Sequence, residues 1–181
     1  TPFESGGRSA IDERDGRREQ FDAQRSAGNT NDLRGSILRI TPQDDGGYTV
    51  PDDNLFTEAH GYGDVDDSLV KKEIWAMGFR NPFTLKIDRE TDVPYTADYG
   101  PDAGGWDSSR GPPGQTSFNQ LDDPGFYGWP YFKGPSIPYK DYDFATGESG
   151  DLFDPTGPTN DSPANDGLQT LPAATDPMVP M

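Results

Sequence analysis

The stretch Pro82-Phe83-Thr84-Leu85-Lys86-Ile87-Asp88-Arg89-Glu90-Thr91-Asp92-Val93-Pro94-Tyr95-Thr96-Ala97-Asp98 decides the fold class of this chain. Its two ends are rich in β-branched, aromatic and aliphatic residues, and a polar turn at 89–92 separates them. This pattern predicts two antiparallel strands, 82–88 and 93–98. The run Glu73-Ile74-Trp75-Ala76-Met77 lies just before them and predicts another strand, which we expect to belong to the same sheet.

The chain on either side of this segment has the same character. Gly35–Ile40 predicts a strand that ends at Thr41-Pro42. An Asp-Asp-Gly-Gly turn at 44–47 follows, and Tyr48-Thr49-Val50 is expected to return as the short partner of that strand. With 22 Gly and 18 Pro spread along 181 residues, long helices are disfavoured. The fold class is therefore predicted to be all-β, with many loops.

The two ends of the chain are polar. Residues 1–30 are read as a loop between strands, with a dense mixture of charges at 11–18. From Gly134 onward Pro, Asp, Asn, Ser and Gly dominate, and no regular core element is expected after about Leu152. We therefore divide the chain into a strand-rich part, 1–152, and a loop-rich C-terminal tail, 153–181. The strand-rich part contains the aromatic cluster 126–132, which we expect to pack between sheets.

Composition excludes several classes of function. There are 32 Asp and Glu against 15 Lys and Arg, which gives a formal charge of −17 and a surface that repels nucleic acid and anionic membranes. Only five of the 15 basic residues are Lys, and such an acidic, Lys-poor surface suits a salt-adapted protein. The 12% aromatic content argues against disorder although only 30% of the residues are hydrophobic. Cysteine is absent, and no apolar run reaches the length of a membrane span.

Four segments, in order and in approximate register, resemble the glucose/sorbosone dehydrogenase family. They are Asn29–Ile40, Glu73–Phe83, Gly100-Pro101-Asp102-Ala103 and Tyr127-Gly128-Trp129-Pro130-Tyr131-Phe132. The resemblance is closest to a secreted, haloarchaeal-type branch whose members often carry additional extracellular modules. It implies a six-bladed β-propeller, of which a chain this long supplies roughly two to three blades and long loops.

The resemblance also implies a cofactor site. Arg80 and Asn81 match the pair that holds pyrroloquinoline quinone, and the backbone carbonyls of Gly100 and Pro101 match the ligands of the calcium ion that polarises it. A guanidinium suits the carboxylates of this quinone, and calcium accepts backbone oxygens. The carbonyl of Tyr127 matches a ligand of a second calcium, but Ser117 stands where the family commonly has an acidic residue. The implied substrate is an aldose oxidised at C1, with an external electron acceptor.

The catalytic base is the main departure from the family. Its chemistry needs a His that takes a proton from the sugar hydroxyl, and the family places this His on a blade that would precede Thr1. The one His of this chain, His60, lies later and reads as a loop residue. No catalytic residue is therefore assigned, and the chain alone is expected to be inactive.

Two other functions remain open at this stage. A non-catalytic secreted propeller could bind carbohydrate through aromatic side chains, with Trp106, Tyr127, Trp129 and Tyr131 as candidates. An acidic calcium-binding protein could use Asp64–Asp67 and Asp122-Asp123, although neither segment has the spacing of an EF-hand. Arg80-Asn81-Pro82 taken alone also fits an ordinary turn.

Overall fold

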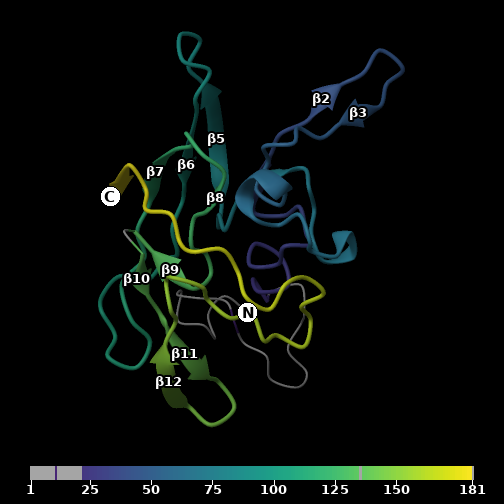
Figure 1. Ribbon diagram of the computed structural model, residues 1–181. Helices are drawn as coiled ribbons and strands as arrows, with labels where there is room; N and C mark the ends of the chain where they lie inside the picture. The colour runs from purple at the N-terminus through teal and green to yellow at the C-terminus, as the bar shows by residue number, and fades with distance from the viewer. Residues whose placement is uncertain (1–10, 12–21, 135, 181) are drawn as a thin grey trace.

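The computed structural model describes residue 11 and residues 22–134 and 136–180 (Figure 1). Within these residues the regular structure is strand and two 3-10 helices, η2 (Glu58–His60) and η3 (Asp67–Leu69), with no α-helix. The predicted all-β class is confirmed. The strands are β1 (Ser36–Leu38), β2 (Thr41–Pro42), β3 (Tyr48–Thr49), β4 (Ile74–Met77), β5 (Pro82–Ile87), β6 (Pro94–Asp98), β7 (Ser117–Gln120), β8 (Gly125–Phe126), β9 (Phe132–Lys133), β10 (Ile137–Pro138), β11 (Lys140–Asp143), β12 (Glu148–Leu152) and β13 (Val179–Pro180).

The largest sheet has four antiparallel strands in the order β13-β7-β6-β5. Its β5–β6 hairpin confirms the pair of strands predicted from the polar turn at 89–92. The turn is closed by the Asp88 N–H, which donates to the Val93 carbonyl at 3.0 Å, and Asp92 adopts a left-handed φ of 57° within it. β4 was expected in this sheet, and that expectation is wrong. A left-handed Gly78 (φ 80°) follows β4, and β4 pairs elsewhere.

The second sheet has the order β1-β4-β8, in which β4 pairs antiparallel with β1 and parallel with β8. The strand predicted at Tyr48 was expected to pair with β1. Instead β3 pairs with β2, directly across the turn. The reason is that β1 is already paired with β4. This pairing continues past the strand, where the Arg39 N–H donates to the Glu73 carbonyl at 2.8 Å. The β2–β3 hairpin therefore extends away from the rest of the molecule (Figure 1).

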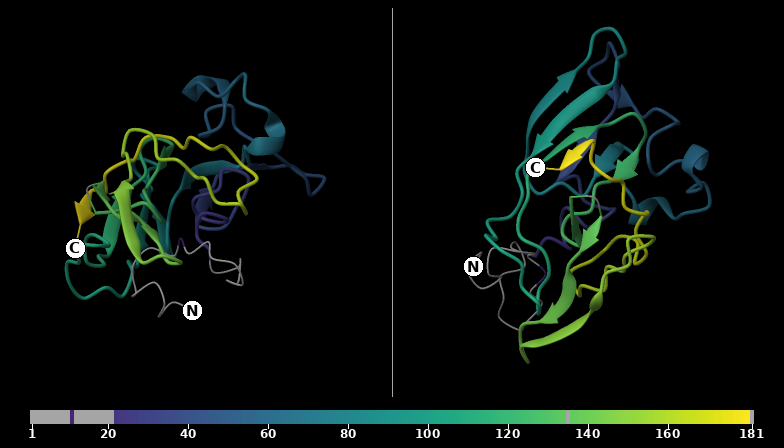
Figure 2. Two further views of the ribbon diagram at one scale, coloured as in Figure 1. Left: turned by 90° about the horizontal axis from the view of Figure 1, so that it is seen from below. Right: turned by 90° about the vertical axis from the view of Figure 1, so that its left-hand side faces the viewer.

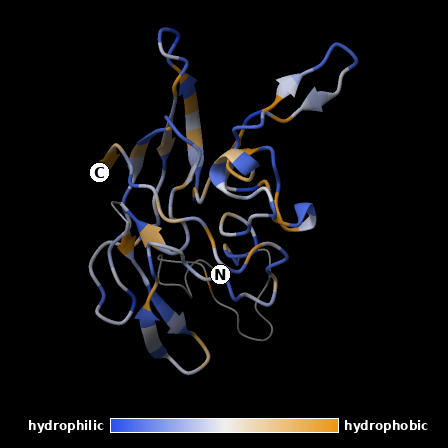
Figure 3. Ribbon diagram, viewed as in Figure 1, coloured by the Kyte–Doolittle hydropathy of each residue, from blue (hydrophilic) through white to orange (hydrophobic). Residues whose placement is uncertain are grey.

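The main core lies where β4, β8 and β9 meet. Phe126 and Tyr131 are fully buried, and Phe132 is nearly so, which confirms that the aromatic cluster packs in the interior. Phe126 and Tyr131 meet edge to face, with ring centroids 6.2 Å apart. The remaining buried members of this cluster are Leu55, Phe56, Val70, Ile74, Met77 and Leu171. In contrast, Phe83, Leu85 and Ile87 of β5 are more than half exposed, and β5 carries hydrophobic bands in Figure 3.

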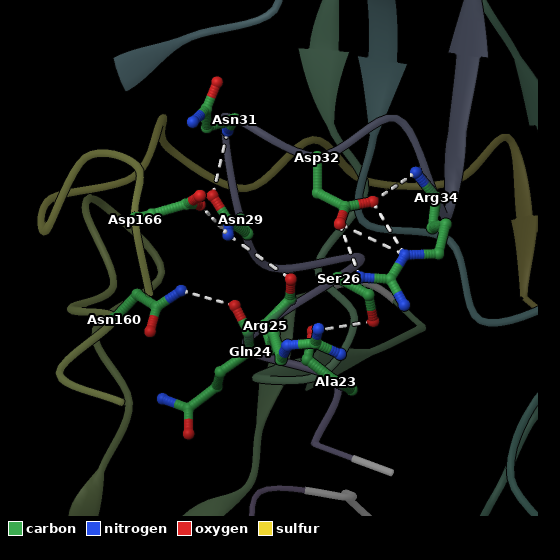
Figure 4. A network of polar contacts seen from close by, with 10 residues as sticks. All are labelled: Ala23, Gln24, Arg25, Ser26, Asn29, Asn31, Asp32, Arg34, Asn160 and Asp166. Carbon is green, nitrogen blue, oxygen red and sulfur yellow. Dashed lines mark hydrogen bonds and ion pairs between the residues drawn. The ribbon is translucent and has the colours of Figure 1, made fainter. Parts of the chain in front are cut away.

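The C-terminal residues belong to the folded body, which corrects the expectation of no core element after Leu152. Leu171 is 3% exposed in the main core, and β13 completes the four-stranded sheet. The buried Asn160 donates through Nδ2 to the carbonyls of Gln24 (2.7 Å) and Gly28 (2.8 Å), as Figure 4 shows in part. These contacts join residues 153–180 to the segment that begins at residue 22, and both views of Figure 2 place the two segments side by side.

Most of the predicted N-terminal loop, including the charges at 12–18, lies outside the described residues. Residues 22–30 form turns without a strand, in keeping with that prediction. Among the residues that the structure describes, none belongs to a helix with the length and apolar character that crossing a bilayer takes.

Candidate functional site

The turn that carries Arg80 and Asn81 is held by a half-buried carboxylate. Asp98, the last residue of β6, accepts the Asn81 N–H through Oδ1 at 2.7 Å and the Arg80 N–H through Oδ2 at 3.2 Å. The Asn81 carbonyl accepts the Tyr99 N–H at 3.1 Å. Because β5 begins where β6 ends, these bonds fix the approach to β5. The Arg-Asn-Pro segment is therefore a turn with a defined shape, whatever else it does.

Burial controls the protonation of Asp98. Loss of solvent raises the pKa of its carboxyl from 3.8 to about 6, while the backbone N–H groups of Asn81 and Arg80 and the charge of Arg80 act in the opposite direction. The carboxyl thus titrates well above an ordinary Asp. Its negative charge is correspondingly costly inside the fold.

The guanidinium of Arg80 lies between two segments. Its Nη1 donates to the Tyr99 carbonyl at 3.2 Å, and its Cζ lies 5.9 Å from the ring centroid of Trp129. The backbone of Trp129 is itself fixed, because its N–H donates to the Gly78 carbonyl at 2.9 Å. Arg80 therefore links the end of β6 to the aromatic segment.

Gly100 and Pro101 are buried and packed against Gly114 and Gln115. A β-carbon at Gly100 would overlap the Gln115 carbonyl, and one at Gly114 would overlap the Pro101 carbonyl. Only glycine permits this close approach of two backbone segments. The approach places the Gly100-Pro101 pair beside the start of β7.

One small pocket brings most of the predicted site residues together. Its lining includes Arg80, Asp98, Gly100, Pro101, Gln115, Ser117, Asn119, Tyr127, Trp129, Phe132, Lys133, Gly134 and Pro177. Its volume is about 20 Å³, enough for a water molecule or a single ion, so a fused-ring quinone exceeds it. Backbone carbonyls and hydroxyls at such a site suit calcium. Asn81 does not line the pocket, and this residue is exposed.

The side chain of Tyr127 serves packing. Its ring stacks on Phe79 with centroids 4.9 Å apart, and its hydroxyl donates to the Gln120 carbonyl at 3.1 Å. Burial, with the charges of Asp122 and Asp123, raises the pKa of Tyr127 to about 12. This side chain is therefore unsuited to stacking on a sugar. Trp129 and Tyr131 are also buried, and of the four aromatic candidates Trp106 alone is largely exposed, at 67%.

Of the remaining candidate residues, Ser117 lines the pocket and His60 does not. Ser117 lines the pocket, where its Oγ accepts the Asn119 side-chain amide at 3.1 Å. His60 is exposed on η2, with Nε2 3.2 Å from the Asp53 carbonyl, and it does not line the pocket. Within the described part of the chain, no three His, Asp or Glu side chains gather in a way that could hold a metal.

Two residues of the pocket escaped the sequence analysis. Asp98 ends a predicted strand two residues before Gly100, and a carboxylate in that place is a signal that sequence reasoning could have used. Lys133 is 9% exposed on β9, and burial lowers the pKa of its ammonium. Nothing in its sequence neighbourhood distinguishes it from a surface lysine.

These observations define an all-β protein with a polar pocket at the ends of its strands. The sequence model of the glucose/sorbosone dehydrogenase family matches residues 14–155, and the chain belongs to this family. No curated protein matches the chain at a significant level.

Two solved structures share a weaker similarity with the chain. A glucose dehydrogenase is similar with a TM-score of 0.46 and 19% identity, over 94% of this chain and 34% of that one. A second glucose dehydrogenase structure gives 0.44 and 21%, over 95% and 35%. The chain therefore spans about a third of the length of these structures.

Proposed function

We propose that this protein is a sugar dehydrogenase that uses pyrroloquinoline quinone and calcium to oxidise an aldose at C1 and passes the electrons to an external acceptor. The observation that carries the proposal is the convergence of Arg80, Gly100 and Pro101 on one pocket. These residues come from two separate segments of a chain that belongs to the glucose/sorbosone dehydrogenase family.

Each residue has a role that its chemistry supports. The carbonyl oxygens of Gly100 and Pro101 would hold calcium, which fits a pocket of ionic size. The guanidinium of Arg80 would pair with an oxygen of the quinone outside this small space, and the exposed amide of Asn81 would donate beside it. When bound, the quinone accepts the two electrons that leave the sugar, and calcium polarises its carbonyl. Asp98 keeps both residues in place through their backbone N–H groups.

The proposal assigns no catalytic base to this chain. His60 lies outside the pocket, and the proton acceptor is proposed to come from another part of the protein. Tyr127 is kept as a carbonyl ligand of a second calcium only as part of this proposal. Its pocket partner Ser117 offers a neutral hydroxyl, a weaker calcium ligand than a carboxylate.

The decisive experiment is a titration with pyrroloquinoline quinone in calcium buffer, followed by quenching of tryptophan fluorescence. We expect Arg80→Ala to raise the Kd of the quinone by about tenfold or more, because one charge-assisted pair is lost. Arg89→Ala is the matched control, since Arg89 is exposed in the β5–β6 turn. An equal Kd for the two variants would overturn the assignment of Arg80.

A second candidate is a non-catalytic propeller that binds carbohydrate, favoured by the 67% exposure of Trp106. Sugar binding that is lost in Trp106→Ala, in a protein with no affinity for the quinone, would support it.

We further propose that the protein is secreted, adapted to concentrated salt and joined to additional extracellular modules. The charge of −17 and the small number of lysines support the salt adaptation, and unfolding measured at rising KCl concentration tests it.

A further inference from the structure

Strand β5 is an exposed edge of the four-stranded sheet. It is the last strand in the order β13-β7-β6-β5, and among the residues that the structure describes no strand pairs with its other side. Its apolar side chains are also exposed, Phe83 by 61%, Leu85 by 52% and Ile87 by 55%. An edge strand with an apolar surface is a ready template for pairing with another strand.

The backbone groups at the free edge of β5 follow from its pairing with β6. Ile87 lies opposite Pro94, and the Pro94 carbonyl accepts the Leu121 N–H at 2.9 Å. Pro94 therefore directs its carbonyl toward β7, and it has no N–H to donate to β5. Because bonded and non-bonded pairs alternate in an antiparallel ladder, Ile87 directs its N–H and C=O away from β6. Leu85, two residues earlier, does the same, so both offer main-chain hydrogen bonds to an incoming strand.

The same strand borders an apolar groove. Leu85 and Ile87 both line it, and they therefore share one face of β5. The groove has a volume of about 400 Å³ and is also lined by Ile37 and Leu38 of β1 and Trp75 of β4. A strand that pairs with β5 places every second side chain on this face. Such a strand gains apolar contact in addition to main-chain hydrogen bonds.

The sequence of β5 is self-complementary in an antiparallel pair. Apolar and polar residues alternate from Phe83 to Ile87, so the pattern is the same in both directions. With Leu85 on a two-fold axis, it lies opposite its own counterpart, and each Phe83 lies opposite an Ile87. Each Lys86 then lies opposite a neutral Thr84. A lysine on an edge strand usually discourages pairing. Here it selects the register, because a pair centred on Lys86 would set two ammonium groups opposite each other.

We propose that β5 is the contact strand of a homodimer, in which the β5 strands of two copies pair antiparallel about Leu85 and join two four-stranded sheets into one. A second copy fits because the contact is self-complementary, and two identical patches related by a two-fold axis close into a dimer. None of the residues that form this contact lines the pocket beside Gly100, so the dimer is independent of the dehydrogenase assignment.

Salt controls whether two copies associate. Each chain carries a formal charge of −17, so two copies repel each other in dilute buffer. The range of this repulsion falls to about 3 Å at 1 M salt, whereas the burial of apolar side chains does not depend on charge. The dimer therefore becomes more stable as salt rises. A contact with a basic partner has the opposite salt dependence, since its attraction to the acidic chain is screened.

Sedimentation velocity of the 181-residue chain, in dilute buffer and in about 2 M KCl, tests the dimer. We expect a monomer in dilute buffer and, in KCl, a dimer whose fraction rises with protein concentration. Leu85→Glu should weaken association about tenfold or more, because two carboxylates would face each other on the axis. Leu152→Glu is the matched control and should associate like the wild type. Leu152 is 56% exposed on β12, outside the groove, and β12 pairs with β11.

Cross-linking tests the register independently. The chain contains no Cys, so Leu85→Cys and Phe83→Cys each introduce a single thiol. Opposite residues of a hydrogen-bonded pair have Cα atoms about 5.5 Å apart, within reach of a disulfide. The two Phe83 positions are four residues apart along the paired strands, about 13 Å. We expect the oxidant diamide in KCl to link Leu85→Cys chains and to leave Phe83→Cys chains unlinked.

Three results would overturn the assignment of β5. They are a wild-type chain that stays monomeric at every concentration in KCl, a dimer that persists in Leu85→Glu, and an association that weakens as salt rises. Both Glu substitutions replace exposed side chains, so the urea unfolding midpoint of each variant should stay close to that of the wild type. This measurement separates lost pairing from lost folding.

Discussion

The carboxylate of Asp98 accepts the backbone N–H of Asn81 at 2.7 Å, across the gap between the end of β6 and the start of β5. The same carboxylate accepts the N–H of Arg80. One side chain thus fixes both residues of the pair that the sequence marks as cofactor ligands. The shape of the site depends on a residue that need not touch the cofactor.

Replacement of Asp98 by Ala should destabilise the protein and weaken quinone binding together. Two backbone N–H groups would lose their acceptor, and a hydrogen bond of this kind contributes about 0.5–1.5 kcal/mol to stability. Urea unfolding measures the first effect and fluorescence titration the second. Asp122→Ala is the control, because Asp122 is exposed at the end of β7. Unchanged stability of Asp98→Ala would show that these two hydrogen bonds do not hold the turn at Arg80 and Asn81.

The stability of the fold should depend on pH through Asp98. The pKa of this carboxyl rises from 3.8 to about 6 on folding, chiefly because burial disfavours its charge. The folded state therefore holds a proton that the unfolded chain releases between these values. Asp98 thus favours the fold most below pH 4, and this contribution declines as the pH rises to 6. The difference in unfolding free energy between wild type and Asp98→Asn, measured from pH 4 to 7, should change over this interval. A constant difference would show that the pKa is not raised.

A methyl group at position 100 should damage the pocket, whereas one at position 104 should not. A β-carbon at Gly100 meets the Gln115 carbonyl, but at Gly104 nothing lies within 4 Å. Overpacking against backbone costs about 1–3 kcal/mol. We expect Gly100→Ala to lower the melting temperature and weaken calcium binding, and Gly104→Ala to behave as wild type. Similar calcium affinities for the two variants would argue against Gly100 in the site.

The C-terminal residues should contribute to global stability. Leu171 is 3% exposed in the main core, whereas Met178 is 52% exposed. We expect Leu171→Ala to reduce the free energy of unfolding by about 2–5 kcal/mol, and Met178→Ala to have little effect. Chemical unfolding followed by tryptophan fluorescence compares them. Equal effects would mean that residues 153–180 form the loosely attached tail first predicted.

The local part of this fold is readable in the sequence. The polar turn at 89–92 predicts the β5–β6 hairpin because strand propensity and turn chemistry act over neighbouring residues. The partners of β4 could not be predicted in this way. They are β1 and β8, which lie far from β4 in the sequence, and no local pattern specifies which strands pair. The same applies to the short β13, whose Val-Pro sequence carries no strand signal of its own. Long-range pairing depends on the packing of the whole chain.

The residues of the candidate site also fall into two groups, those that sequence motifs identify and those that only the folded structure reveals. The motifs point to Arg80, Gly100, Pro101 and Tyr127, and the structure lines one pocket with all four. The Arg80-Asn81 pair also predicts Asn81 in the site, but this residue is exposed and outside the pocket. The two-residue motif carries no information on that exposure. Asp98 and Lys133 were missed because their importance comes from burial, a property of the assembled fold.

The pairing of β13 with β7 has a consequence for biosynthesis. Residues 179 and 180 supply the last strand of a sheet whose other three strands are made much earlier, so a ribosome must translate the intervening segment before that sheet is complete. Until then β7 presents an unoccupied edge to the cellular environment. The nascent chain therefore has an interval in which a foreign strand can compete for that place, and the rate of elongation becomes a determinant of the folding yield.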